Sequence, residues 1–157
     1  MNLADFEGRL AGVLRDADLR TVAVISCTDP DAFAQFMIDE VGTKGTLLIT
    51  QAGGETLSPD GEAQLQAAGF QLDPVMPTRV WSAESSWPTP SARLRELAHA
   101  MVAALEDCGV ASPENLTYKA WRDPEPWPAE VTGEELAALD RGQNPLPIPE
   151  LGLLARG

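Results

Sequence analysis

The sequence predicts an α+β fold, with an antiparallel sheet of three to five strands packed against two or three helices. Apolar residues spaced three and four apart predict helices at the start of the chain and around residues 94–105. The β-branched, nearly continuous run Thr21–Cys27 is typical of a buried strand. A turn at Thr28–Asp31 follows this run, and a tight glycine-bounded turn at Gly42–Gly45 follows the next segment, so neighbouring antiparallel strands are favoured.

Three helices are expected within the main domain. The first spans residues 2–16, which carry a regular apolar stripe. The second opens at Ser58-Pro59, an N-cap followed by proline at the first helical position, and it stops at Gly69. The third follows Pro88-Thr89-Pro90 and closes at Gly109. Its apolar face is the clearest of the chain and consists of Leu94, Leu97, Ala98, Met101, Val102 and Leu105.

The strands are expected to form a meander. The segment Ala32–Val41 fits a strand or a helix by its period alone, and the turn Gly42–Gly45 after it favours the strand. The expected strands of the meander are Thr21–Cys27, Ala32–Val41 and Thr46–Ile49. Further short strand candidates are Phe70–Leu72 and Arg79–Ser82, and Pro113–Trp121 is an ordered extension of unassigned type.

The composition changes after residue 121. We therefore predict a domain over residues 1–121 and an acidic, proline-rich tail over residues 122–157. Within the tail, the spacing of Thr132 and Glu135 matches a capping box and predicts a short helix near residues 133–140. Prolines between residues 144 and 149 favour an extended polyproline conformation. Because the tail is too apolar for a solvated linker, we predict that Trp127 and residues 145–149 dock on the domain.

The charge and the two cysteines narrow the classes of partner and location. The chain of 157 residues has a net charge of −13, which disfavours binding to nucleic acid or to an anionic membrane surface. Cys27 and Cys108 have no metal-site spacing, and we expect both to be small buried hydrophobes. The N-terminal residues do not read as a signal peptide and no stretch reaches membrane-span length, so we expect a cytoplasmic protein.

No motif in the sequence indicates catalysis or a cofactor. The one histidine, His99, stands at no ligand spacing to a cysteine, and it is expected at the edge of a helix rather than in the role of a general base. No nucleophile elbow, phosphate-binding glycine loop or calcium loop occurs. We therefore expect neither catalytic residues, nor a metal site, nor a cofactor.

Aromatic residues are the strongest candidates for contact with a partner. Tryptophan supplies a large contact area at low entropic cost and is enriched at binding hot spots. The same tryptophans could instead cap the sheet and hold the tail, and the sequence leaves both readings open. The candidate partner-binding residues are Phe33, Phe36, Trp81, Trp87, Trp121 and Trp127.

The order of elements over residues 1–121, together with short motifs inside it, carries a family resemblance. The motifs are Phe33-Ala34-Gln35-Phe36, Leu57-Ser58-Pro59 with Leu65 and Ala68-Gly69-Phe70, Leu97-Ala98, Met101-Val102, Leu105, Gly109-Val110, Pro113, Leu116 and Tyr118. This pattern resembles the fold of type III secretion chaperones and the related YbjN proteins, and more specifically it is similar to the N-terminal domain of the TY-Chap family of peptide-binding chaperones. The chain departs from that family's pattern after the third strand, where Thr50-Gln51-Ala52-Gly53-Gly54 replaces an acidic residue and an asparagine.

The resemblance implies a non-enzymatic module that binds a protein or peptide by apolar contact or strand addition, and that can form a homodimer. Fold likeness alone does not fix function. The alternative is an acidic immunity or inhibitor protein that neutralises a basic partner such as a toxin, because the length and the charge fit that role as well.

Overall fold

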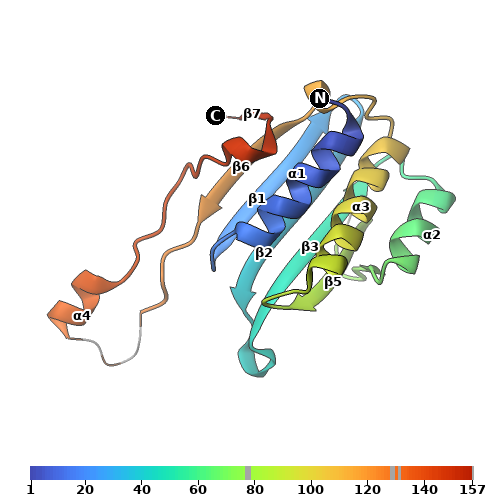
Figure 1. Ribbon diagram of the computed structural model, residues 1–157. Coiled ribbons are helices and arrows are strands. Elements are labelled where there is room, and N and C mark those ends of the chain that lie inside the picture. Colours follow the sequence, from blue (N-terminus) through green and yellow to red (C-terminus); the bar gives the residue numbers. More distant parts are fainter. Residues whose placement is uncertain (77–78, 128–129, 131, 157) are drawn as a thin grey trace.

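Three helices lie on one face of a single sheet in the computed structural model, which describes residues 1–76, 79–127, 130 and 132–156 (Figure 1). α1 (Leu3–Asp16) begins at a capping box formed by Asn2 and Asp5. α3 (Ser91–Asp107) packs beside α1, and α2 (Pro59–Ala67) packs against α3. These are the three helices predicted for the domain.

The sheet has seven strands within the described residues, so the expectation of three to five was too low. Their order is β4-β5-β3-β2-β1-β6-β7, and the last pair is parallel, which makes the sheet mixed rather than antiparallel throughout. The meander of β1, β2 and β3 is confirmed, and the second of these segments is a strand. The strands are β1 (Thr21–Thr28), β2 (Asp31–Glu40), β3 (Thr46–Gly54), β4 (Gln71–Leu72), β5 (Val80–Ser86), β6 (Thr117–Arg122) and β7 (Leu154–Ala155).

The two strands that the sequence analysis did not predict, β6 and β7, lie at one edge of the sheet, and both are short. β6 has only six residues, and its alternation of polar and apolar residues is interrupted at Ala120-Trp121. β7 is two residues long, too short for any periodicity to appear. The described part of the tail also holds α4 (Gly133–Ala138), where a short helix near residues 133–140 was predicted, so the described residues contain four α-helices. Its predicted capping box, formed by Thr132 and Glu135, is present.

The core lies between the sheet and the helices. Alternate residues of each strand face the helices, and the largest fully buried side chains include Phe6 and Leu10 of α1 and Phe36 of β2. Among the described residues, Thr50 is one of two buried polar ones, and its hydroxyl donates a hydrogen bond to the Ala83 carbonyl over 3.3 Å. Every second side chain therefore remains for the opposite face of the sheet.

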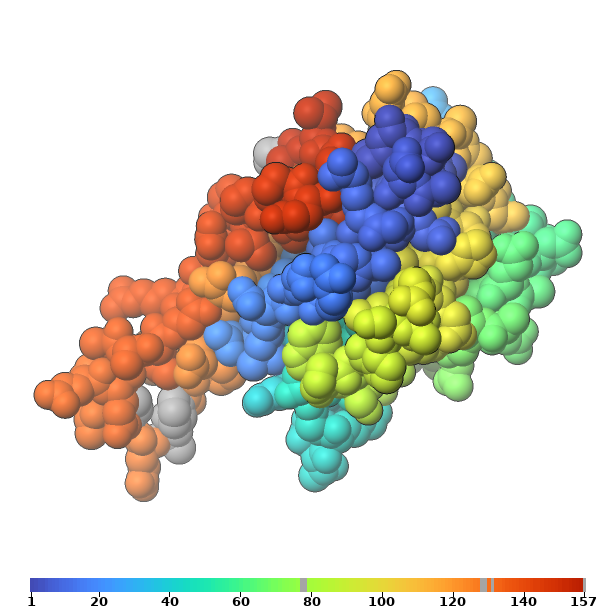
Figure 2. Space-filling view, viewed as in Figure 1, coloured from blue at the N-terminus to red at the C-terminus, as the bar shows by residue number. Residues whose placement is uncertain are grey.

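The last part of the tail returns to this core. Ile148 and Leu151 are buried in it, and the 3-10 helix η3 (Pro149–Leu151) packs on α1, as Figure 2 shows for the red segment beside the blue helix. The docking predicted for residues 145–149 is thus confirmed. The docking predicted for Trp127 is wrong, because its side chain is 73% exposed on an arm that projects from the body (Figure 1). Residues 128, 129, 131 and 157 of the tail lie outside the described residues.

Candidate functional site

The face of the sheet opposite α1, α2 and α3 carries no helix of the described residues, and we call it the open face. Because Ala23, Ile25 and Cys27 belong to the core, the residues between them point to the open face, and the registers extend this assignment across the sheet. The residues of the open face used below are Val22, Val24, Ser26, Phe33, Gln35, Met37, Ile49, Gln51, Gly53, Val80, Ser82, Glu84, Lys119, Trp121, Leu154 and Arg156.

One row of apolar side chains crosses four strands of the open face. Trp121 of β6 pairs with Val22 of β1, which pairs with Met37 of β2, which pairs with Ile49 of β3. Val22 is 7% exposed because its neighbours flank it, whereas the other three side chains are partly exposed. Such a contiguous partly exposed strip is a candidate for contact with another chain.

A second apolar row crosses the sheet at the level of Ser26, four residues beyond Val22 on β1. Its central residue is Phe33 of β2, whose ring covers Gly53 of β3. Val80 of β5 pairs with that glycine. A Cβ atom on Gly53 would lie 2.9 Å from Cε1 of Phe33 and 2.8 Å from the Arg79 carbonyl oxygen. Glycine is therefore required here by the close approach of the ring and the neighbouring backbone.

Polar side chains separate the two rows. Gln35 pairs with Gln51, and the Gln51 amide nitrogen donates to the Ser82 hydroxyl over 3.0 Å. The two apolar rows are four residues apart along the strands, or about 13 Å at the usual rise. Side chains i and i+4 of an extended peptide lying along the strands have the same separation.

The six predicted partner-binding residues occupy different parts of the molecule. The structure brings only Phe33 and Trp121 to the open face. Phe36 and Trp81 lie in the core, where the Trp81 indole donates to the Glu62 carboxylate over 2.9 Å, so a partner cannot reach them in this conformation. Of the others, Trp87 packs partly buried against the core, and Trp127 is exposed on the arm.

Sequence reasoning missed Met37, Ile49 and Val22 as residues of the open face. The signal was present in β1 and β2, where apolar residues occupy both the odd and the even positions. A strand with one solvated face normally alternates apolar and polar residues. Apolar residues on both faces therefore indicate either a second covering layer or a binding surface.

The outer edge of β6 is closed by the tail. The Leu146 amide donates to the Ala120 carbonyl over 2.9 Å, and the Arg156 amide donates to the Tyr118 carbonyl over 2.7 Å. Arg122 forms an isolated bridge with Gln143 at the far end of the strand. A partner strand cannot pair with this edge while the tail is in place, which leaves contact across the open face as the available mode there.

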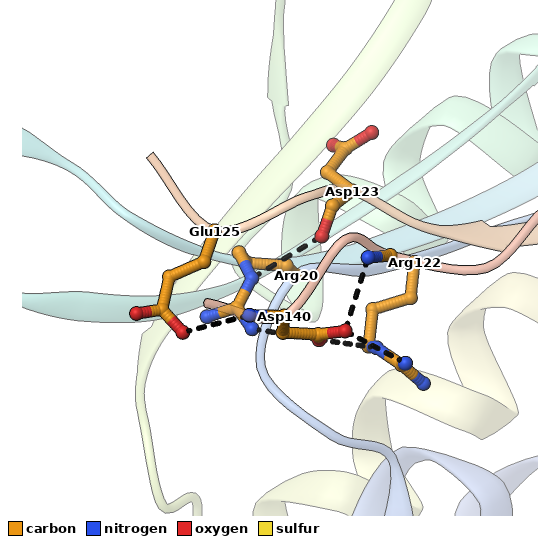
Figure 3. A network of polar contacts seen from close by, with 6 residues as sticks. Arg20, Arg122, Asp123, Glu125 and Asp140 are labelled. Carbon is orange, nitrogen blue, oxygen red and sulfur yellow. Dashed lines mark hydrogen bonds and ion pairs between the residues drawn. The ribbon is translucent and has the colours of Figure 1, made fainter. Parts of the chain in front are cut away.

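An ion-pair network holds the base of the projecting arm, which consists of residues 123–127, 130 and 132–143 (Figure 3). Asp140 accepts two hydrogen bonds from Arg122, at 2.7 and 3.1 Å, and one from Arg20 at 3.0 Å. The Arg122 guanidinium, followed by the backbone amide of Gly142, holds the pKa of the Asp140 carboxyl well below its usual range. The network fixes where the arm leaves the sheet.

A shallow hollow of about 500 Å³ lies on the helix side, between the end of α1 and the tail. Val13, Leu146 and Ile148 supply apolar lining, and Arg9, Arg15 and Asp16 supply charged lining. Most of its apolar side chains already pack in the core, so it offers less apolar contact than the open face. This hollow is the alternative ligand-binding site to the open face.

The remaining chemical groups are arranged as follows. His99 is exposed on α3, and its Nδ1 atom lies 2.9 Å from a Glu7 carboxylate oxygen of α1. Cys27 and Cys108 are free and buried, and burial, followed by the charge of Asp107, raises the pKa of the Cys108 thiol to about 11.

Among the described residues, no group of three or more His, Cys, Asp or Glu side chains is placed to hold a metal ion. None of the described helices has the length and hydrophobicity to cross a membrane.

Comparison with known proteins identifies the family. No curated protein and no solved structure matches the chain significantly. One family model matches residues 4–122, which run from the start of α1 to the end of β6 and exclude the tail. The chain therefore belongs to this family, TY-Chap3, the type III secretion system (YopN, CesT) and YbjN peptide-binding chaperone 3 family.

Proposed function

We propose that this protein is a non-enzymatic binding module that holds an apolar segment of a peptide or protein on its open face. The observation that carries the proposal is the helix-free sheet face with two rows of apolar side chains, in a member of a peptide-binding chaperone family. The partly exposed members of these rows are Trp121, Met37, Ile49 and Phe33. Both rows stand on paired central strands, so the surface is held by the backbone ladder rather than by mobile loops.

The spacing of the rows supports an extended ligand. Burial of two apolar side chains, one on the row around Met37 and one against Phe33, stabilises a complex by about 25 cal/mol for each Å² of apolar surface removed from water. The polar line between them can hydrogen-bond the ligand through Gln35. A peptide whose residues i and i+4 are apolar fits this arrangement.

A second copy of the chain is the competing occupant of the same face, and it corresponds to the homodimer expected from the family resemblance. The inhibitor alternative asks for carboxylates at the binding surface, whereas the centre of the open face is apolar and amide-bearing. We therefore place the peptide-binding function first.

The test is selection from a random phage-displayed library of twelve-residue peptides, followed by affinity measurement of the enriched peptides by fluorescence anisotropy. The double variant Met37→Thr/Ile49→Thr removes apolar surface from one row and keeps side chains that favour strands. Since both residues are partly buried already, we expect a loss of about 1 kcal/mol each, or about thirtyfold in affinity for the pair.

The control is Ala63→Asp, at an exposed position of α2 on the helix side. This variant should bind the peptides as the wild type does, and thermal denaturation checks that both variants stay folded. Unchanged binding by Met37→Thr/Ile49→Thr would exclude the open face. A wild-type dimer that this variant dissociates, without any peptide binding, would assign the face to a second copy.

A further inference from the structure

Two cations stand together at the β6–β7 side of the open face. Lys119 and Arg156 are both exposed, and the parallel register of the two strands places them next to each other. The Arg156 guanidinium donates to the hydroxyl of Ser26, whose strand neighbours face the core, so the arginine side chain lies over the open face. In the described part of the chain, neither cation has a carboxylate within ion-pair distance.

This arrangement is unusual for so acidic a chain. The protein has 24 carboxylate residues against 11 lysines and arginines. Among the described residues, six of those cations form ion pairs with carboxylates. Arg20 and Arg122 pair at the arm base, and Arg79 pairs with a carboxylate of α2. Neighbouring like charges across a strand pair repel each other, and here no carboxylate of the described residues relieves that repulsion.

The carboxylates on this side of the sheet lie away from the cation pair. Glu84 of β5 is bonded to Lys44 over 3.3 Å, and Asp123 accepts from the Trp121 indole over 3.1 Å. Asp31 and Asp39 stand near the two ends of β2. The centre of the open face is uncharged, and its β6–β7 margin is positive.

The position of the cations relative to the apolar rows defines a ligand pattern. Lys119 pairs with Val24, an apolar residue within the otherwise polar line midway between the rows of Val22 and Ser26. On an extended peptide along β1, residue i lies over the row of Trp121 and residue i+4 lies near Phe33. Residue i+2 then points to the same side, at the level of Lys119.

We propose that the ligand of the open face is a peptide with an acidic residue flanked at two positions on either side by apolar residues, in the order apolar-x-acidic-x-apolar. This inference rests on the proposed function and specifies its ligand. The net charge of −13 repels such a peptide at long range, but at 0.15 M salt the screening length is about 8 Å. Contact with Lys119 and Arg156 then outweighs the distant carboxylates.

The experiment compares the same phage-displayed library on three proteins at 0.15 M salt. Wild type should enrich Asp or Glu two positions from an apolar residue, and Lys119→Glu/Arg156→Glu should enrich Lys or Arg there instead. Arg95→Glu/Arg141→Glu changes the net charge equally, at exposed positions off the open face, and should select the wild-type pattern. In a synthetic copy of an enriched peptide, changing the acidic residue to its amide should weaken wild-type binding about tenfold.

Two results would overturn the inference while leaving the proposed function intact. They are enrichment of apolar peptides without an acidic position, and identical peptides from wild type and Lys119→Glu/Arg156→Glu. Absence of any enrichment on wild type, or full binding of the enriched peptides by Met37→Thr/Ile49→Thr, would overturn the proposed function as well.

Discussion

Gly53 and Phe33 show how single residues shape the open face. The edge of the Phe33 ring can occupy the space beside Gly53 of β3 only because position 53 has no side chain. A larger residue there would push the ring outward and also meet the Arg79 carbonyl oxygen, which belongs to the backbone and cannot turn away. The apolar surface that the ring offers to a ligand therefore depends on one glycine in the neighbouring strand.

Gly53→Ala should lower the free energy of unfolding by about 1–3 kcal/mol through this overpacking. Chemical denaturation measures the effect. Gly8→Ala is the matched control, because a Cβ atom there meets nothing within 4 Å and position 8 lies inside α1. The control should gain about 0.5–1 kcal/mol. Equal responses of the two variants would show that the ring does not press on Gly53.

Phe33 and Phe36 illustrate what the sequence could and could not supply at the site. Both were predicted as partner contacts because they are aromatic, within a segment predicted as a strand. In a strand, residues three apart point to opposite faces, and the structure places Phe36 in the core and Phe33 on the open face. The signal that could have located the site was the presence of apolar residues at both the odd and the even positions of β2. That signal also indicates Met37.

At the level of elements, the tail strand β7 and the 3-10 helix η3 complete the sheet and the core. Leu151 is fully buried against α1, and the Ile148 amide donates to the Tyr118 hydroxyl over 2.8 Å. A segment outside the family match thus closes the edge of β6 and carries Arg156 to the open face.

Leu151→Ala should destabilise the whole protein by about 2–5 kcal/mol, because it removes a buried side chain and leaves a cavity. Leu154→Ala, in the same tail but 77% exposed, should change stability by less than about 0.5 kcal/mol. Urea denaturation of both variants separates these outcomes. If Leu151→Ala were as mild as Leu154→Ala, the tail would be an appendage rather than part of the core.

The arm base should respond to pH through Asp140. Its pKa lies below the unfolded-state value of 3.8, so its stabilising contribution is complete above that pH and is lost as the pH falls through the folded-state pKa. Asp140→Asn should therefore speed hydrogen exchange of the Glu125 and Gln143 amides at pH 5–8 by a constant factor. The difference from wild type should shrink below pH 4.

Glu134→Gln, the same charge change at an exposed position of α4, is the control for the arm base and should leave both amides protected. If Asp140→Asn exchanged like wild type at pH 7, the network of Arg20, Arg122 and Asp140 would not hold the arm. A difference that grew toward acid pH would contradict the direction of the pKa shift.

For the molecule as a whole, the sequence was sufficient for the helices and the meander of the domain. Caps, glycine stops and helical stripes are local signals, and the structure shows them at Ser58, Gly69 and Gly109. The pairing of the tail strand β7 with β6 could not be predicted from the sequence. The two strands are more than thirty residues apart in the chain and pair through only two positions. Nonlocal pairing of so short a strand leaves no periodic trace.

The most direct test of the peptide-binding assignment is a methyl NMR titration with an enriched peptide. The four isoleucines report on different places: Ile49 on the open face, Ile148 at the helix-side hollow, and Ile25 and Ile38 in the core. We expect the methyl groups of Ile49 and Met37 to shift most on saturation and that of Ile148 to stay in place. A shift confined to Ile148, with Ile49 and Met37 unmoved, would place the ligand in the hollow and contradict the assignment to the open face.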